Sequence, residues 1–527
     1  MLDPGVQAPT TLLISSFGLP PEAQFRGYCW MGSDLVVGQH GADDYERRTG
    51  ERVGRGRDGC YTVVEQTAAG FRVGTDSRGL ARLFLFRRAG AWVISSSFHD
   101  LVEHLRARGV VLRSELALVA AFGVPRGFTD QLASSTTPIA DITLVPSFAS
   151  VVLEASGAEI EMAAMAGDPS YEEALHTYVN VWRGRLSTLL ADSRVSMQVD
   201  LSGGIDSRTV LAFLLASKEY SPKHPRVSVV SNASKLLDLE VATQVACAYD
   251  LTLEEQPQPG RRAAEPLRAR RAWRQDSLGM YLPLYFHSTT LDLAAVHAHG
   301  AGGGNFRPYY SGSSAGDQVR RARASMSPEH YEQWSEAVSA SSRVLEAARP
   351  AVHPLTLHYR EFRNRFHFGH LPHHSIVFSP LESALTDAVT DRQDHRDGRQ
   401  IYFDVMESLA PGLKDLPFDD PSKSPSQANV RDLTVVDLET PTPGRVFGEP
   451  QGVSGPLALE DPYGIWIEDV ARALRRDEVR AVLGADAVAK AASAVRGFQE
   501  DQRRSHAHDK ELLAASFALA ADFIVRG

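Results

Sequence analysis

A short polar stretch, Ser202-Gly-Gly-Ile-Asp-Ser207, combines residue types that together can hold a phosphate group. Glycines let the backbone come close to a phosphate, and the hydroxyls of Ser202 and Ser207 add donors. Asp206 is the unusual member, because a carboxylate repels phosphate unless a cation lies between them, and Mg²⁺ would supply that cation. The stretch therefore predicts a phosphate site with Asp206 as a metal ligand. A strand-to-helix turn capped by a serine or aspartate is the alternative interpretation.

The segments on either side predict where this turn lies. Residues 195–201 form a short apolar and β-branched run, which predicts a buried strand. Residues 209–215 are apolar enough to form a helix packed on a sheet. The turn would then join the carboxyl end of a strand to the amino end of a helix, where unpaired N–H groups and the helix dipole favour an anion. The turn does not match the Gly-x-x-x-x-Gly-Lys-Ser/Thr pattern of a Walker loop.

The composition is that of a globular protein with more than one domain. The chain has 527 residues, of which 43% are hydrophobic and 23% are charged, and this length predicts two or three domains. The formal net charge of −10 argues against a polyanion as the main partner, so no nucleic acid is expected. The basic stretch 261–274 is the local exception, and it favours a solvated face or a loop over the nucleotide.

The cysteines and the apolar segments favour a cytoplasmic protein. Cys29, Cys60 and Cys247 are widely spaced, and no Cys-x-x-Cys pair occurs, which excludes a disulfide scaffold and a cysteine-built zinc site. The amino terminus has no charged segment before an apolar core, and no apolar run reaches membrane-spanning length. We therefore expect a cytoplasmic enzyme without membrane contact.

The first region, residues 1–157, is expected to be rich in sheet. Its apolar residues occur in short β-rich pieces broken by glycine and aspartate, with one helical stretch at residues 98–108. Residues 157–169, which are rich in alanine, glycine and methionine, favour a domain boundary.

The second region, residues 170–430, is expected to be an α/β domain. A helical apolar stripe covers residues 171–191, and strands then alternate with helices, as at residues 226–230 and 293–297. This alternation predicts a parallel sheet that binds its ligand at the carboxyl ends of the strands. Residues 431–527 are expected to form a mostly helical extension.

Several stretches together resemble a known family. The Ser202–Ser207 turn resembles the pyrophosphate loop of the N-type ATP pyrophosphatases, which cleave ATP between the α and β phosphates. Further stretches follow the order found in the asparagine synthetase-like amide ligases of that group: 59–64, 73–86, 92–102, 227–241, 300–307 and 378–383. β-Lactam synthetase and the lasso-peptide cyclases are the most similar in type. The resemblance implies an N-terminal glutaminase-like (Ntn-type) α+β sandwich and a C-terminal adenine-nucleotide α-hydrolase-like domain.

The same resemblance implies the residues of the site. The expected ATP contacts are Ser202, Gly203, Gly204, Asp206, Ser207, Val230, Gly302 and Gly303. The expected catalytic residues are Asp206 and Lys423, and Asp206 would also bind Mg²⁺, so that ATP and Mg²⁺ are the implied cofactors. Lys423 is the only lysine of the Pro-rich stretch 419–426, where the alternative is an exposed linker lysine.

The first departure from the family concerns its glutaminase nucleophile. A glutaminase of this type needs cysteine as its first residue, whose free α-amine serves as base for the thiol. Here Leu2 follows Met1, and the cysteines are internal. We therefore expect the N-terminal domain to be a scaffold that releases no ammonia from glutamine. β-Lactam synthetase and the lasso-peptide cyclases share this loss and use an amine of the substrate.

The second departure concerns the glycine-rich stretch 300–307. The family usually has Gly-x-Gly-x-Asp-Glu there, and its aspartate binds magnesium, whereas this chain has Gly304 and Asn305. Ala301 stands where β-lactam synthetase has a catalytic tyrosine. The glycines can still hold pyrophosphate, and Arg307 can neutralise it. A nucleotide site without catalytic activity is the alternative that this stretch leaves open.

Other polar residues are weaker candidates. Asp238 or Glu240 could replace the missing metal ligand. His297 and His299 flank the glycine-rich stretch, where a histidine is more often packed or hydrogen-bonded than a base. Residues 367–374 have a histidine spacing suited to a metal, but without interleaved cysteine or carboxylate the spacing favours substrate contacts or helix-end packing.

Taken together, these features predict an ATP-dependent amide-bond-forming ligase. It would adenylate a substrate carboxylate and let a substrate amine displace AMP, as in β-lactam or lasso-peptide biosynthesis. The expected partners are a small-molecule or peptide substrate that carries both groups, and a second copy of the chain in a homodimer. The alternatives are a ligase that uses ammonia or an amine from a partner, an enzyme that modifies tRNA or a nucleobase through the same adenylation, and a non-catalytic nucleotide-binding subunit.

Overall fold

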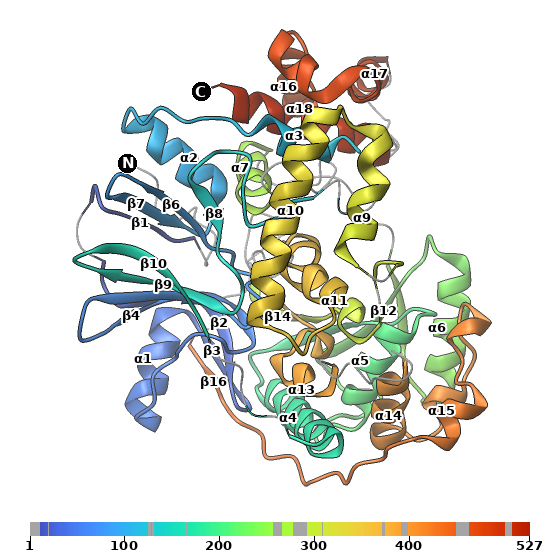
Figure 1. Ribbon diagram of the computed structural model, residues 1–527. Helices are drawn as coiled ribbons and strands as arrows, with labels where there is room; N and C mark the ends of the chain where they lie inside the picture. The colour runs from blue at the N-terminus through green and yellow to red at the C-terminus, as the bar shows by residue number, and fades with distance from the viewer. Residues whose placement is uncertain are drawn as a thin grey trace.

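The protein combines a sandwich of two sheets, antiparallel except for one edge strand, with a parallel sheet and surrounding helices (Figure 1). The computed structural model describes residues 11–18, 21–124, 128, 131–163, 167, 169–256, 266–277, 292–307, 309–312, 314–370, 375–390, 399–448, 463–500 and 509–526. The expected α/β class is therefore confirmed.

The N-terminal region is a two-sheet sandwich. Its first sheet contains, in spatial order, β1 (Leu13–Ser15), β7 (Ala91–Ser95), β6 (Phe84–Arg88) and β8 (Ile142–Leu144). Its second sheet contains β10 (Gly157–Met162), β9 (Ala149–Glu154), β5 (Phe71–Thr75), β4 (Gly59–Gln66), β2 (Gln24–Met31), β3 (Asp34–Val37) and β16 (Val446–Phe447). One hydrophobic cluster holds side chains of both sheets, including Ile94 of β7 and Val151 of β9. The prediction of a sheet-rich N-terminal region is confirmed.

The two edge strands of the second sheet extend beyond the sheet-rich region predicted at residues 1–157. β10 extends the sheet to Met162, past residue 157, and pairs antiparallel with β9. Its alternation of Ala158 and Ile160 with glutamates is a short strand pattern inside an alanine-rich stretch. β16 pairs parallel with β3, so that a C-terminal segment completes an N-terminal sheet.

The second region contains a five-stranded parallel sheet. Its spatial order is β13 (Leu253–Gln256), β12 (Val227–Asn232), β11 (Ser196–Asp200), β14 (Asp292–Ala298) and β15 (Ser375–Phe378). β11 is central, and the chain moves to β12 on one side and later to β14 on the other. Such a reversal of strand order leaves a crevice at the carboxyl end of the central strand, where ligands of open α/β sheets bind.

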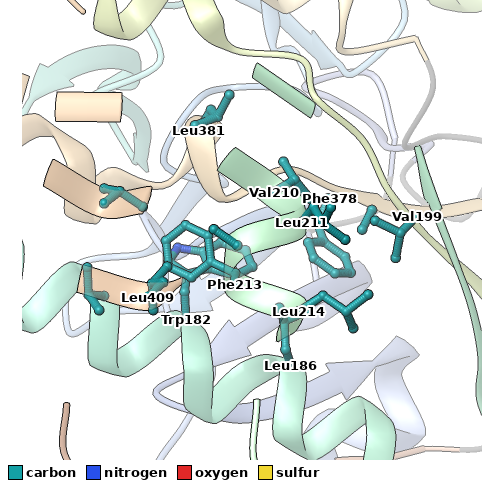
Figure 2. Close-up of a cluster of buried hydrophobic side chains, with 14 of the residues drawn as sticks. Trp182, Leu186, Val199, Val210, Leu211, Phe213, Leu214, Phe378, Leu381 and Leu409 are labelled. Carbon is teal, nitrogen blue, oxygen red and sulfur yellow. The ribbon is translucent and has the colours of Figure 1, made fainter. Parts of the chain in front are cut away.

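Helices bury one face of this sheet, and Figure 2 shows part of the resulting core. The helices are α4 (Tyr171–Ala191), α5 (Ile205–Leu215) and α14 (Gln400–Leu409). Trp182, Phe213, Phe378 and Leu409 meet Val199 of β11 in one cluster of buried side chains. Because Met197 and Val199 of β11 point into this core, Gln198 and Asp200 point to the opposite face. The packing of the core thus determines which polar side chains of β11 lie on the opposite face of the sheet.

The remaining helices lie on both sheet regions and at the end of the molecule that carries the C-terminus (Figure 1). They are α1 (Gly38–Thr49), α2 (Phe98–Ala107), α3 (Leu116–Phe122), α6 (Leu236–Ala248), α7 (Pro266–Ser277), α8 (Gly303–Phe306), α9 (Ala315–Ala322), α10 (Pro328–Ala348), α11 (Pro354–His358), α12 (Arg365–His367), α13 (Asp387–Thr390), α15 (Gln427–Arg431), α16 (Tyr463–Ala473), α17 (Asp477–Glu500) and α18 (Asp509–Val525). Short helical turns η3 (Tyr359–Asn364), η5 (Pro380–Glu382), η6 (Ala384–Thr386) and η8 (Pro421–Lys423) lie between them. None of the helices described here has both the length and the hydropathy needed to cross a membrane.

The C-terminal helices pack against earlier parts of the chain. One buried cluster joins Val479 and Phe517 to Phe98, Phe122 and Leu345. A second cluster places Trp273 of α7 against Trp466 of α16, with ring centroids 4.5 Å apart. The expected helical character of residues 431–527 is confirmed for α16, α17 and α18.

Buried polar contacts join the sandwich to the parallel sheet. The Tyr28 hydroxyl donates to the Val377 carbonyl at 2.8 Å. Asp58, which precedes β4, lies 2.6 Å from Arg185 of α4 and accepts a hydrogen bond from the Ser383 hydroxyl at 2.5 Å. These contacts hold the two regions in one position relative to each other.

Candidate functional site

The glycine turn lies where the sequence predicts it. β11 ends at Asp200, and α5 begins at Ile205 with Gly204 as its N-cap. The Ser207 hydroxyl accepts from the Ser202 N–H at 3.0 Å, and the two serine hydroxyls lie 2.9 Å apart. The turn is therefore closed by its own serines, while the amino end of α5 is directed to the carboxyl edge of the sheet.

A cavity of about 500 Å³ opens at this edge, within the size range of small-molecule sites. The predicted contacts Ser202, Gly204, Asp206, Ser207 and Val230 all line it. The other lining residues come from the ends of neighbouring strands and from the start of α6: Gln198, Asp200, Leu201, Ser231, Asn232, Lys235, Asp238, Gln256, His297, His299 and Gly300.

The glycine-rich stretch after β14 packs directly on the turn. A Cβ atom at Gly300 would lie 2.8 Å from the Ser207 backbone nitrogen. A Cβ atom at Gly303 would lie 2.7 Å from Cγ of Asp206. Gly302 has a left-handed backbone (φ 95°), and its Cα faces Glu382. Gly300 and Gly303 thus permit the close approach of two distant segments, whereas Gly302 lies behind the turn and not among the residues that line the cavity.

Asp206 is held on both carboxylate oxygens. Its Oδ1 accepts from the Tyr402 hydroxyl at 2.5 Å, and its Oδ2 lies 3.2 Å from the Arg307 guanidinium. Burial lowers the pKa of Arg307, but the charges of Asp206 and Tyr402 outweigh it and raise that pKa above its usual range. Burial holds the pKa of Tyr402 well above its ordinary value, so the phenol donates. Tyr402, on α14, was not predicted, because nothing in its local sequence points to the turn.

The surroundings of Asp206 do not fit a resident magnesium ion. Asn305, at the family's metal-ligand position, is buried and directs its amide to the Leu381 carbonyl at 3.0 Å and to Glu382 at 3.2 Å. Asp238 lines the cavity but lies 3.9 Å from Lys235. Among the described residues, no group of three or more histidine, cysteine, aspartate or glutamate side chains is arranged to hold a metal. The predicted role of Asp206 as a metal ligand disagrees with these contacts.

Lys423 lies beside the turn but binds a carboxylate there. Its ammonium contacts both oxygens of Asp419 at 2.7 Å. The Asp419 N–H in turn donates to the Gly203 carbonyl at 3.0 Å. Gly203 has to be a glycine here, since its Cβ would lie 2.5 Å from that of Asp419. Lys423 is thus linked to the turn through Asp419, a partner that the sequence did not single out, and its catalytic role stays a prediction.

Arg208 holds this segment in place and is not a free cation. Its guanidinium donates to the Leu416 carbonyl at 2.8 Å and to the Pro417 carbonyl, and it lies 3.7 Å from the centroid of the Phe418 ring. Burial lowers the pKa of Arg208 to about 10. The side chain therefore anchors the residues that carry Asp419 and Lys423 onto α5.

A carboxylate and two histidines form the floor of the cavity. Nε2 of His297 lies 2.7 Å from Asp200, and Nε2 of His299 lies 3.4 Å from the same carboxylate. Burial raises the pKa of Asp200. The hydrogen bond to His297 and the histidine charges outweigh burial, so the pKa lies below its ordinary value. Burial lowers the pKa of His299. The structure thus brings both flanking histidines to the cavity, where each contacts Asp200.

Glu382 is a buried carboxyl group directly behind the glycine-rich stretch. It accepts from Asn364 at 2.7 Å, and burial raises its pKa to about 7, against the opposing effect of Arg78. A carboxyl group with this pKa is partly protonated near neutral pH. The sequence signal that could have singled it out is its place in the stretch 378–383.

None of the described residues of the other basic and histidine-rich stretches lines the cavity, although Phe368 lies near His299, with ring centroids 6.2 Å apart. Arg270 and Arg274 of α7 contact Asp469 of α16, so this part of the basic stretch joins two helices. His367 ends α12, and His370 is buried. His373 and His374 lie outside the described residues.

The N-terminal cysteines are buried, Cys29 in a cluster with side chains of α1 and Cys60 in the main core. Cys29 and Cys60 have no exposed surface, and burial raises the pKa of the Cys29 thiol far above its usual value. A thiol in this state is a poor nucleophile. We expect incubation with glutamine to release no glutamate above the buffer background, as measured by a coupled glutamate dehydrogenase assay. Release that alkylation with iodoacetamide abolishes would contradict this.

No family model matches this chain, and no curated protein matches its sequence.

Proposed function

We propose that this chain is an ATP-dependent ligase that adenylates a substrate carboxylate and joins it to an amine. The observation that carries the proposal is the glycine turn at the carboxyl end of the central strand β11, opening onto a cavity of about 500 Å³. Backbone N–H groups at the amino end of α5 and a crevice at the reversal of strand order suit a nucleotide phosphate. Val230 of β12, which lines the cavity, supports a place for the rest of the nucleotide there.

The proposed reaction has two steps. A carboxylate oxygen attacks the α-phosphorus of ATP. The bond between the α-phosphorus and the oxygen that bridges to the β-phosphate breaks, and pyrophosphate leaves with that oxygen. The amine nitrogen then attacks the acyl carbon, the bond to AMP breaks, and the amine loses a proton to a base. The turn, Lys423 and Arg307 would stabilise negative charge on the pyrophosphate, which is the main requirement of such a transfer. The class of substrate proposed is a small molecule or peptide of natural-product biosynthesis.

Exchange of labelled pyrophosphate into ATP tests this proposal. Panels of amino acids, short peptides and other carboxylic acids would be incubated with the protein, ATP and [³²P]pyrophosphate. We expect ATP to bind in calorimetry and one class of carboxylate to support exchange. Reactions without carboxylate serve as the control. Binding of ATP without exchange for any carboxylate would favour the alternative, a non-catalytic nucleotide-binding subunit. The ion pair between Asp206 and Arg307 also favours this alternative.

Lys423→Ala is expected to lower the exchange rate constant by about tenfold or more, with ATP affinity nearly unchanged. A cation that acts on charge developing in the transition state changes kcat more than ground-state binding. Lys423→Arg should restore the rate only in part, since a guanidinium does not reproduce a compact ammonium. Lys490→Ala is the control, because Lys490 also pairs with an aspartate four residues earlier, Asp486. A wild-type rate for Lys423→Ala would make this residue a linker lysine.

A further inference from the structure

Three carboxylates around the glycine turn each have a lysine or arginine partner within the protein. Asp206 pairs with Arg307 at 3.2 Å, and Asp419 pairs with Lys423 at 2.7 Å. The third carboxylate, Asp238, lies 3.9 Å from Lys235. A fourth carboxylate, Asp200, contacts the two histidines of the cavity. The charges of the first three therefore have counter-charges in the protein before any ligand binds.

Both carboxylate oxygens of Asp206 have partners in the protein. Gly303 packs against its carboxylate group, and the Tyr402 hydroxyl, which also donates to the Gly303 carbonyl at 3.2 Å, occupies Oδ1. The position beside Oδ2 belongs to Arg307. A metal ion on the Oδ2 side of Asp206 would lie next to the Arg307 guanidinium, whose positive charge would repel it.

Arg307 has a fixed backbone and a side chain that can move. Its N–H donates to the Gly303 carbonyl at 3.1 Å, which ties the residue to the end of α8. The preceding Phe306 is buried in the main core. The Arg307 side chain itself is 48% exposed. The exposed guanidinium can therefore change its rotamer beside Asp206 while the backbone stays in place.

We propose that Arg307 is the resident cation of this phosphate site and takes the place of a divalent ion at Asp206. It neutralises Asp206 in the free protein and binds pyrophosphate oxygens when a nucleotide enters. A guanidinium binds phosphate oxygens in a bidentate manner and keeps its charge at all relevant pH values. The inference rests on the proposed nucleotide binding, and it adds that this binding does not need a metal between Asp206 and the phosphates.

Calorimetric titration with inorganic pyrophosphate and with ATP tests the inference, in EDTA and in excess MgCl₂. We expect the wild-type protein to bind pyrophosphate in EDTA, and Arg307→Ala to bind it at least about tenfold more weakly, with Arg307→Lys between the two. Asp206→Asn should bind it in EDTA at least as tightly as the wild type, because a carboxylate that repels phosphate is gone. Arg320→Ala, which removes another arginine paired with an aspartate, is the matched control and should bind like the wild type.

The outcomes separate this inference from the proposed function. Wild-type binding only in MgCl₂, with equal affinity in Arg307→Ala, would overturn the inference and leave nucleotide binding intact. Weaker binding of pyrophosphate in EDTA by Asp206→Asn would overturn it as well. Failure of the wild type to bind ATP or pyrophosphate in either buffer would overturn the proposed function and the inference together. Melting temperatures of all variants show that each is folded, and Arg307→Lys retains a cation should Arg307→Ala not fold.

Discussion

Gly300→Val is expected to weaken ATP binding by about a hundredfold or more, which corresponds to about 2.8 kcal/mol. A Cβ atom at this position would lie 2.8 Å from the nitrogen and 3.0 Å from Cα of Ser207, both of which belong to the backbone of α5. Neither atom can give way without moving the first turn of the helix. The N–H groups that would face the phosphates would then be displaced from their positions. Calorimetric titration with ATP measures the effect.

Gly464→Val provides the control for Gly300→Val. Gly464 lies on the helix α16, and a Cβ atom there meets no atom of the described residues within 4 Å. This variant should bind ATP like the wild type. The Gly300→Val protein should remain folded, since overpacking costs about 1–3 kcal/mol. Unchanged ATP affinity in a folded Gly300→Val protein would mean that the turn does not bind the nucleotide.

Asp58→Ala is expected to lower the free energy of unfolding by about 3–5 kcal/mol, because it leaves a buried charge without its partner. Asp58 and Arg185 are both buried, 7% and 6% exposed, and lie 2.6 Å apart. The Asp58 carboxylate also accepts from the Ser383 hydroxyl and from the Ala384 N–H. One substitution would therefore remove contacts to α4 and to η6, and loosen the sandwich from the parallel sheet. Urea denaturation, followed by tryptophan fluorescence, measures the loss.

The contribution of Asp58 should depend on pH in a defined direction. Burial raises its pKa, but the charge of Arg185 and the hydrogen bonds outweigh burial, so the pKa in the folded protein lies below the ordinary value, which is about 3.9 in an unfolded chain. The stabilisation is then present above the unfolded pKa and is lost as the pH falls through the folded pKa. The difference in stability between wild type and Asp58→Asn should shrink on acidification below about pH 4.

Asp44→Ala is the control for Asp58. Asp44 pairs with Arg47 and Arg48 on the exposed side of α1, where solvent screens the interaction. We expect the Asp44→Ala variant to differ only slightly from the wild type in its free energy of unfolding. An equally small change for Asp58→Ala would show that the buried ion pair does not hold the two regions together.

The sequence by itself determined the elements whose cause is local. The apolar run before Ser202 and the amphipathic run after Ser207 are sufficient for a strand, a turn and a helix, and these are β11 and α5. Ser170 and Glu173 form a capping box that starts α4 where the apolar stripe begins. In each case the contacts that decide the structure lie within a few residues, so a pattern of residue types is enough to predict them.

Only the tertiary structure decided which side chains meet at the turn. Arg307, Tyr402 and Asp419 come from three different segments, and no spacing in the chain indicates that they surround Asp206 and Gly203. The edge strands β10 and β16 likewise depend on partners far along the chain. The physical reason is that a charged side chain takes the partner that packing places next to it. Local sequence encodes the tendency to form a strand or helix, but the pairing of charges follows from how the sheets and helices bury their apolar faces.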